Sequence, residues 1–267
     1  MKIFDLKGKT ALITGGAGTL GFEFAKILSE SGSNIVILDL NIKECEDRAR
    51  KITEKYGVKT LGLNCSITSE EAVDEVVSVV INKFKSIDIL INSAAITQIG
   101  NHTSKDYFKP FEDYPLDIWK KAIDVNLTGT FIITKRVIKE MIKEKNGTII
   151  NISSTYGLVS PNPQIYASLN FSSPIHYSVS KGGIIQFTRY LAAHLADKGI
   201  RVNTLSPGGL FEESMDKNFV NRYQDNTPLG RMANIKDYQG AILFLASDAS
   251  SYMTGANLVV DGGWTAV

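Results

Sequence analysis

Residues 10–21 read Thr10-Ala11-Leu12-Ile13-Thr14-Gly15-Gly16-Ala17-Gly18-Thr19-Leu20-Gly21, a short apolar run followed by a glycine-rich turn. The apolar run is typical of a buried strand, and the amphipathic pattern over 20–31 predicts a helix directly after the turn. Glycines in such a turn let backbone N–H groups approach a pyrophosphate, and the helix N-terminus directs its dipole at the same place. The stretch therefore predicts a strand–turn–helix unit that binds a dinucleotide.

The same alternation of strand and helix continues along the rest of the chain. Further apolar runs predict strands at 35–38, 87–91, 148–152, 200–203 and 258–260. Amphipathic stretches predict helices at 41–56, 69–84, 127–144, 181–198 and 237–247. Short apolar strands suit a parallel sheet that is covered on both faces. We therefore expect a single α/β domain over 1–267, a Rossmann-type doubly wound parallel sheet of about seven strands flanked by helices on both faces.

Three segments interrupt this alternation, and they lie at 97–115, 155–175 and 208–230. Each follows a predicted strand, so we expect each at the carboxyl edge of the sheet, where open α/β folds bind their ligands. We interpret them as substrate loops. The alternative is that they are surface loops without a role in binding.

Composition narrows the class of protein. The chain has 267 residues, 43% of them hydrophobic, and a net charge of +1, which gives no general basic field for nucleic acid or an anionic membrane. Cys45, Cys65 and three scattered histidines have the spacing of neither a disulfide framework nor a metal site. No run is long and apolar enough for a signal peptide or a membrane span. We expect a cytoplasmic protein without a metal, which acts on a small molecule and binds neither nucleic acid nor membrane.

An acidic residue, Asp39, closes the second predicted strand. A carboxylate at that place accepts hydrogen bonds from the ribose hydroxyls of an adenosine group and repels a 2′-phosphate. The sequence therefore favours NAD as the cofactor, with NADP the less favoured choice. The alternative role for Asp39 is a helix N-cap, and the nearby cation Lys43 would weaken the discrimination.

A tyrosine and a lysine are spaced by one helical turn. His176-Tyr177-Ser178-Val179-Ser180-Lys181 opens a predicted helix, so that Tyr177 and Lys181 share a face. A neighbouring ammonium lowers the pKa of a phenol by favouring the phenolate, which allows Tyr177 to act as a general acid or base near neutral pH. Upstream, Ser153 and Ser154 end a strand, and either hydroxyl is a candidate to bond a substrate oxygen.

Taken together, these landmarks resemble the short-chain dehydrogenase/reductase family in its compact single-domain form, over essentially the whole chain. The resemblance rests on an ordered series of motifs: Thr14-Gly15 to Gly21, Asn92-Ser93-Ala94-Ala95, Asn126, Ser154, Tyr177 with Lys181, Ser206-Pro207-Gly208 and Leu258-Val259-Val260-Asp261-Gly262-Gly263.

The resemblance implies roles for individual residues. Ser154 orients and polarises the substrate oxygen, Tyr177 transfers the proton, and Lys181 holds the nicotinamide ribose and lowers the Tyr177 pKa. Asn126 supports a water-linked proton relay, or alternatively only bonds backbone at the start of its helix. The implied cofactor-binding residues are Gly15, Gly18, Thr19, Leu20, Gly21, Asp39, Ser66, Ile67, Asn92, Ala94, Tyr177, Lys181, Pro207 and Gly208. The expected substrate contacts are Ser154, Tyr156, Tyr166, His176 and Gly209.

The chain also departs from the family pattern. Thr19 stands where the glycine motif usually has glycine, Ala95 ends a signature that usually ends in glycine, and Ser66 replaces an aspartate that contacts adenine. These changes concern the adenosine half of the cofactor rather than the chemistry. The interval from Ser154 to Tyr177 is longer than usual in the family, and its extra residues predict an unusual wall over the substrate.

These observations predict an NAD(H)-dependent oxidoreductase that interconverts a secondary alcohol and a ketone by hydride transfer. Hydrogen-bonding side chains in the three loops favour a polar polyhydroxyl substrate, such as a sugar, a sugar derivative or a polyol, unless they only face water: Gln98, Asn101, His102, Ser104, Asn162, Gln164, Asn170, His176, Glu212, Glu213, Asp216, Lys217 and Arg222. Two alternatives remain: a 3-oxoacyl-(acyl-carrier-protein) reductase, against which Asp39 and the neutral charge count, and a non-catalytic nucleotide-binding sensor or scaffold. The resemblance also implies a homo-oligomer, either a tetramer or a dimer.

Overall fold

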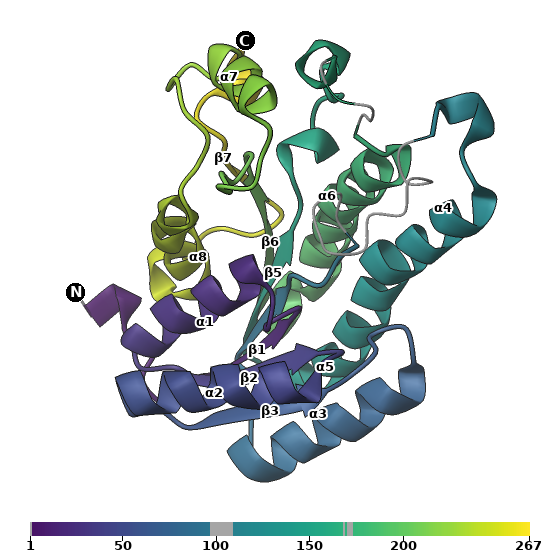
Figure 1. Cartoon of the computed structure of the whole chain (residues 1–267). Helices are drawn as coiled ribbons and strands as arrows, with labels where there is room; N and C mark the ends of the chain where they lie inside the picture. Colours follow the sequence, from purple (N-terminus) through teal and green to yellow (C-terminus); the bar gives the residue numbers. More distant parts are fainter. Residues whose placement is uncertain (1, 97–108, 168, 170–172) are drawn as a thin grey trace.

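Seven strands form one parallel sheet in the computed structural model, which describes residues 2–96, 109–167, 169 and 173–267 (Figure 1). The strands are β1 Thr10–Thr14, β2 Asn34–Asp39, β3 Thr60–Asn64, β4 Ile89–Asn92, β5 Gly147–Ile152, β6 Ile200–Pro207 and β7 Asn257–Val260. Their order is β3-β2-β1-β4-β5-β6-β7, and every neighbouring pair is parallel. This order confirms the predicted doubly wound sheet, with the reversal of strand order between β1 and β4.

Helices cover both faces of the sheet. The first face carries α1 (Thr19–Glu30), α2 (Ile42–Tyr56) and α8 (Gln239–Ala246). The opposite face carries α3 (Glu70–Phe84), α5 (Thr130–Glu144) and α6 (Ile175–Leu195). Two further helices are α4 (Leu116–Ile123), which packs beside α6, and α7 (Lys217–Asp225), which lies next to Gly209 beyond the end of β6.

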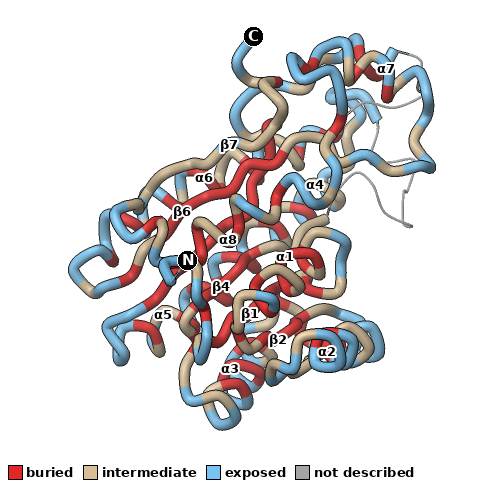
Figure 2. Tube along the Cα trace, turned by 90° about the vertical axis from the view of Figure 1, so that its left-hand side faces the viewer, coloured by how far each residue is buried: buried red, intermediate tan, exposed pale blue. Residues whose placement is uncertain are grey.

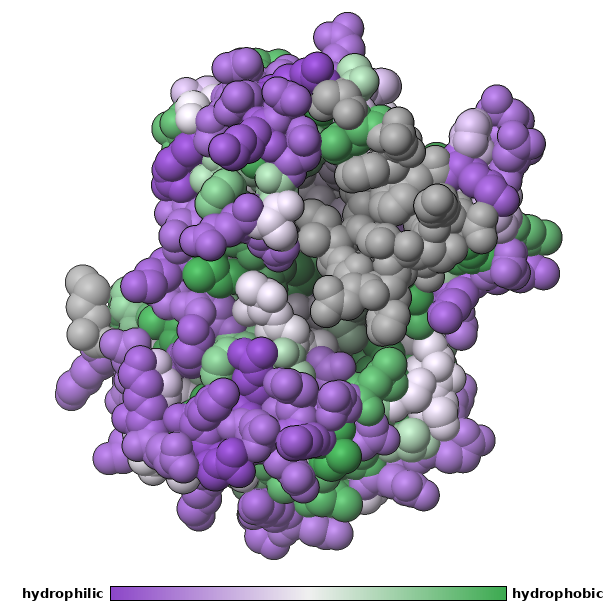
Figure 3. Space-filling model, viewed as in Figure 1, coloured by the Kyte–Doolittle hydropathy of each residue, from purple (hydrophilic) through white to green (hydrophobic). Residues whose placement is uncertain are grey.

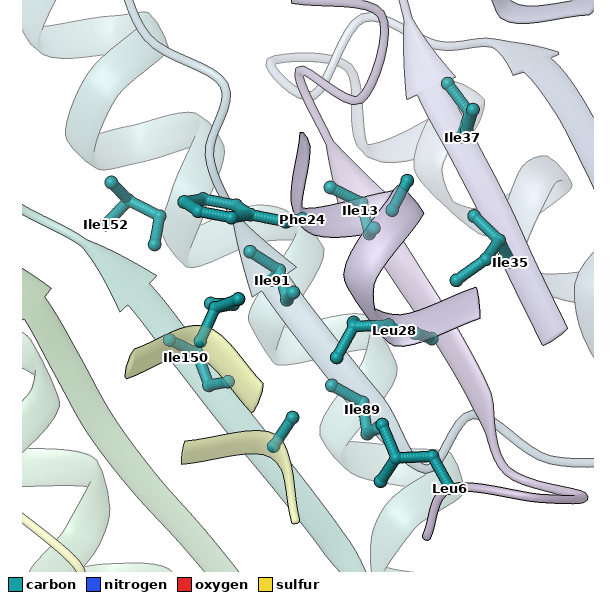
Figure 4. Packing of buried hydrophobic residues seen from close by; sticks show 14 of the residues in the cluster. Leu6, Ile13, Phe24, Leu28, Ile35, Ile37, Ile89, Ile91, Ile150 and Ile152 are labelled. Carbon is teal, nitrogen blue, oxygen red and sulfur yellow. The ribbon is translucent and has the colours of Figure 1, made fainter. Parts of the chain in front are cut away.

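Each face of the sheet has its own apolar core, because successive strand residues point to opposite faces. Ile13 and Ile35 pack under α1 and α2, whereas Leu12 and Val36 pack against α3 and α5. Figure 4 shows Phe24 of α1 over the isoleucines of the central strands, and Figure 2 shows buried residues concentrated along those strands. The strands that carry the site are therefore held rigidly from both sides.

The structure differs from the sequence pattern at three elements. β3 reads Thr60-Leu61-Gly62-Leu63-Asn64 and lies at the sheet edge, where its residues are only partly buried, so it lacks the apolar run of an inner strand. The other unpredicted elements are α4 and α7, and α7 lies inside the segment 208–230 that the composition predicts as a loop. The helix α6 begins at Ile175, which agrees with the prediction that His176 to Lys181 opens a helix, and it ends at Leu195, before the predicted end at residue 198.

Residues 97–108, 168 and 170–172 lie outside the described residues. The predicted loops 97–115 and 155–175 are therefore described only in part, and Gln98, Asn101, His102, Ser104 and Asn170 fall outside the description. Among the residues that the structure describes, every helix is too short or too polar to cross a lipid bilayer.

Candidate active site

A cavity of about 800 Å³ opens at the carboxyl edge of the sheet, at the point where the strand order reverses. The turn after β1 and the residues that end β2, β5 and β6 line it together with the first half of α6. On the face in Figure 3, hydrophilic residues cover the lower part and hydrophobic residues gather near the centre.

The cavity brings together most of the predicted site residues, from segments far apart in the sequence. Those that line it are Gly15, Gly18, Thr19, Leu20, Gly21, Asp39, Ser66, Ile67, Ala94, Ser154, Tyr156, Tyr166, Tyr177, Lys181, Pro207, Gly208 and Gly209. Asn92, Asn126 and His176 are not part of the described lining.

The turn after β1 has the geometry of a phosphate cradle. Gly15 adopts a positive φ of 63°, and a Cβ atom there would lie 2.8 Å from the Ala94 Cα. A Cβ at Gly21 would overlap the Gly15 carbonyl oxygen. Gly18 caps α1 without a side-chain hydrogen bond, so the first N–H groups of the helix have no capping acceptor from that residue. These bare glycines and the positive helix end fit a pyrophosphate.

Asp39 ends β2 beside this turn. Its Oδ2 accepts a hydrogen bond from the Ala17 N–H at 3.2 Å, and its Oδ1 accepts one from the Leu40 N–H at 2.8 Å. The cap of α2 is Asn41, so Asp39 does not have the alternative role of a helix cap. The carboxylate lines the cavity next to the glycine turn, which is where an adenosine ribose would lie.

Three polar side chains line the part of the cavity that follows β5 and opens α6, and they belong to Ser154, Tyr177 and Lys181. The Lys181 Nζ donates a hydrogen bond to the Ile152 carbonyl at 2.7 Å and lies 5.7 Å from the centre of the Tyr177 ring. Ser154 lines the cavity together with Tyr177, and its hydroxyl lowers the pKa of the Tyr177 phenol. The Ser153 hydroxyl instead donates to the Lys181 carbonyl at 2.7 Å, so its proton is used inside the fold. The geometry therefore favours Ser154 over Ser153 as the hydroxyl that faces the reacting groups.

Burial dominates the ionisation of this cluster. It raises the pKa of Tyr177, and the hydrogen bond with Ser154 acts in the opposite direction. Burial also lowers the pKa of Lys181 to about 8, because the charged ammonium is disfavoured away from water. Ser154 is thus the group that lowers the Tyr177 pKa in this structure, while lowering by Lys181 stays a prediction.

Replacing Lys181 tests the cost of burying its charge. The folded pKa of about 8 lies below the ordinary 10.5, so the unfolded chain binds more protons and the free energy of unfolding should rise with pH between these values. We expect Lys181→Met to remove this rise and to stabilise the fold at about pH 7 by on the order of 2 kcal/mol, since the lost bond to Ile152 offsets part of the gain. Denaturant titrations across this pH range measure the effect, with the exposed Lys139→Met of α5 as control. If the free energy of unfolding of Lys181→Met depended on pH as it does in the wild type, the lowered pKa of Lys181 would be contradicted.

Two asparagines that the sequence assigns to the site, Asn92 and Asn126, form hydrogen bonds within the fold. Asn92 donates to the Asn151 side chain at 2.7 Å inside the sheet, and its predicted cofactor contact stays a prediction. Asn126 lies in the π-helical segment Asp124–Gly129, where its Oδ1 accepts from the Ile96 N–H at 2.6 Å and its Nδ2 donates to the Ser180 hydroxyl at 3.1 Å. These bonds agree with the alternative of backbone support, and the proton relay stays a prediction.

The segment between Ser154 and Tyr177 is anchored at both ends. A Cβ at Gly157 would lie 2.7 Å from the Lys181 backbone, so this turn packs directly on α6. At the other end, the fully buried His176 bonds the Tyr114 hydroxyl at 2.5 Å through Nδ1, and burial lowers the pKa of His176 to about 4. Tyr177 is part of the described cavity lining whereas His176 is not, and the contact of His176 with substrate stays a prediction.

The cavity wall also contains side chains that the sequence does not assign. Met215, Phe219, Tyr223 and Met232 line it, and Lys121 lies in the same lining. The spacing of Phe219 and Tyr223 by four residues is the one available signal, because it places them on the same face of α7.

This wall is more aromatic than the loop composition predicts. The Tyr156 and Tyr166 hydroxyls bond each other at 2.9 Å, and the Tyr166 ring centre lies 5.4 Å from that of Phe219. Of the charged residues expected from 208–230, Glu212 lines the cavity, whereas Glu213, Asp216, Lys217 and Arg222 are not part of the described lining. The described wall therefore offers aromatic surface with a few hydrogen-bonding groups.

A phosphate cradle and a serine–tyrosine–lysine cluster at one sheet edge define a nucleotide-binding oxidoreductase. A family model described as enoyl-(acyl carrier protein) reductase matches residues 15–265. The 3-oxoacyl-(acyl-carrier-protein) reductase of Aquifex aeolicus is 33% identical over 261 residues, which cover 97% of this chain and 98% of the relative. The chain belongs to the short-chain dehydrogenase/reductase family.

Solved structures of named dehydrogenases are also similar to this chain. A xylitol dehydrogenase with bound NAD⁺ is 32% identical and superposes with a TM-score of 0.86, over 97% of this chain and 99% of the other. A gluconate 5-dehydrogenase from Burkholderia cenocepacia, in complex with NADP and tartrate, is 30% identical with a TM-score of 0.88, over 99% and 98% of the two chains. Each likeness extends over nearly the whole of both chains.

Proposed function

We propose that this protein is an NAD(H)-dependent oxidoreductase that interconverts a secondary alcohol and a ketone on a polyhydroxyl substrate, such as a sugar, a sugar derivative or a polyol. One observation carries the proposal. Ser154 and Tyr177, with the Lys181 ammonium 5.7 Å from the Tyr177 ring centre, line the same cavity as the glycine cradle and Asp39. A substrate oxygen at the hydroxyl pair would thus lie within reach of a cofactor in the cradle.

The cofactor fits residues along the whole cavity. The turn from Gly15 to Gly21 would hold its pyrophosphate, Asp39 its adenosine ribose and Lys181 its nicotinamide ribose. The bound nicotinamide supplies the chemistry of hydride exchange. Ser154 donates a hydrogen bond to the substrate oxygen; Tyr177 accepts the hydroxyl proton as a phenolate during oxidation, after losing its own proton to solvent, and donates a proton as the phenol during reduction. Since burial raises the Tyr177 pKa, the neutral phenol is the resting form and is ready to donate in the direction of reduction.

The preference for NAD rests on Asp39, because relatives with either cofactor are similar to this chain. The carboxylate lines the cavity where a 2′-phosphate would have to lie. Within the described lining the basic side chains are Lys121 and Lys181, neither of which follows β2, and Lys43 is not part of that lining.

The proposed substrate class rests on the wall and on the relatives. Glu212 and the Tyr156–Tyr166 pair offer acceptors and donors for hydroxyl groups, and the aromatic rings offer surface to the C–H faces of a sugar ring. The similar structures include enzymes named for xylitol and gluconate, both of them polyhydroxyl compounds.

A substrate panel tests this proposal. Polyols, sugars and simple secondary alcohols are incubated with NAD⁺, and NADH formation is followed by absorbance. We expect at least one polyhydroxyl compound to exceed every simple alcohol in kcat/KM by about tenfold or more, because buried polar groups discriminate against substrates that leave them unpaired. A second arm supplies a 3-oxoacyl thioester with NADPH. The similarity to the 3-oxoacyl-(acyl-carrier-protein) reductase of Aquifex aeolicus makes reduction of such a thioester the second candidate activity. Faster turnover of the thioester than of every polyhydroxyl compound would contradict the proposed substrate class.

A further inference from the structure

One peptide group beyond the end of β6 is held by two tyrosine side chains. It joins Gly208 to Gly209, which both line the cavity. The carbonyl of Gly208 accepts a hydrogen bond from the Tyr238 hydroxyl at 2.9 Å, and the N–H of Gly209 donates one to the Tyr223 hydroxyl at 2.7 Å. The remaining N–H and carbonyl of the two glycines bond to backbone. The plane of this peptide is therefore fixed from both sides.

Both tyrosines are themselves immobilised. Tyr238 is fully buried at the end of the 3-10 helix Ile235–Tyr238, directly before α8. Tyr223, on α7, is 3% exposed and stacks on Trp264 with ring centres 4.3 Å apart and planes at 21°. Figures 1 and 2 both show the C-terminal segment beside α7. Burial raises the pKa of Tyr223 to about 12 and also raises that of Tyr238, so both stay neutral phenols around neutral pH.

The packing around this peptide leaves no room for side chains. A Cβ at Gly209 would lie 2.6 Å from the Tyr223 ring, and one at Gly208 would lie 2.8 Å from the Asp261 Cα. Tyr223 also lines the cavity together with Thr155, the residue after Ser154, and the Thr155 side chain lowers the Tyr223 pKa.

We propose that Tyr223 and Tyr238 are positioning residues, which hold the Gly208–Gly209 peptide as the wall against which the nicotinamide half of the cofactor lies. The inference rests on the proposed function, which assigns the nicotinamide ribose to Lys181 of the same lining; Tyr223 is part of that lining, whereas Tyr238 is fully buried outside it. Loss of either hydroxyl would free the peptide to rotate at the nicotinamide end, while the cradle and Asp39 at the adenosine end would keep their contacts.

The test compares a whole cofactor with one that lacks nicotinamide. In Tyr223→Phe and Tyr238→Phe, the dissociation constant for NADH is measured by fluorescence and that for ADP-ribose by calorimetry. We expect NADH to bind about tenfold more weakly in both variants, as one lost hydrogen bond predicts, and ADP-ribose to bind within about twofold of wild type. Tyr252→Phe, at a fully exposed tyrosine, is the control for removal of a hydroxyl and should change neither constant.

Two results would overturn the inference. One is unchanged NADH affinity in both variants, and the other is an equal loss for NADH and ADP-ribose, which would mean a general effect on the fold. If Tyr238→Phe fails to fold, Tyr223→Phe decides between these outcomes. A wild-type protein that binds neither ligand would contradict the proposed function itself, and the inference with it.

Discussion

Tyr177→Phe should lower kcat by about a thousandfold or more and leave the dissociation constant for NADH within about twofold of wild type. The substitution removes the hydroxyl that carries the proton but keeps the ring that lies 5.7 Å from the Lys181 ammonium. The Gly208–Gly209 peptide and the glycine turn after β1 keep their shape, so the cofactor should still bind. Steady-state turnover of the best substrate from the panel and NADH fluorescence titrations measure the two quantities.

The control for this variant is Tyr190→Phe, because Tyr190 lies on the same helix but is 59% exposed. It should turn over substrate at the wild-type rate. Substantial activity in Tyr177→Phe would show that another group moves the proton. A loss of NADH binding that matches the loss of turnover would instead mean that the tyrosine holds the cofactor.

Asp39→Asn should remove most of the preference for NADH over NADPH. We expect the wild type to bind NADH about 100-fold more tightly, because the carboxylate repels a 2′-phosphate at short range, and the variant to bind it less than about tenfold more tightly. The amide keeps the shape of the side chain and one acceptor for the Ala17 or Leu40 N–H, so the glycine turn should stay in place. Fluorescence titrations with both cofactors measure the ratio.

A matched charge change separates a local effect from a general one. Asp197→Asn removes the same charge in the exposed 3-10 helix Ala196–Lys198 after α6, and it should leave the ratio at the wild-type value. Tighter binding of NADPH than of NADH by the wild type would refute the cofactor assignment.

The inner strands and most helices are predictable because their signals are local. Ile35-Val36-Ile37-Leu38 is buried on both faces and reads as one apolar run, whereas Thr60-Leu61-Gly62-Leu63-Asn64 is half-exposed at the edge and has no such run. Gly62 in that strand lies against the Cys45 backbone, a requirement that only the packed sheet and helix reveal. Edge elements thus depend on neighbours that the pattern does not contain.

The candidate site likewise contains residues that local sequence predicts and residues that only the packing of the fold places. Tyr177 and Lys181 are predictable because one helical turn sets their relation, and the structure brings both to the cavity. The directions of the His176 and Asn92 side chains depend on the packing around them, which the sequence pattern does not contain, and their predicted ligand contacts stay predictions. The wall residue Phe219 comes from a segment that sequence composition marks only as a loop, and its place depends on how α7 packs on Tyr166.

The double anchoring of the segment after Ser154 separates chemistry from recognition. Gly157 fixes one end on the Lys181 backbone and His176 fixes the other on Tyr114, so the residues between can change in length or kind without displacing Tyr177. Selection, or a combinatorial library confined to that span, can thus exchange what the enzyme accepts while its proton transfer stays intact.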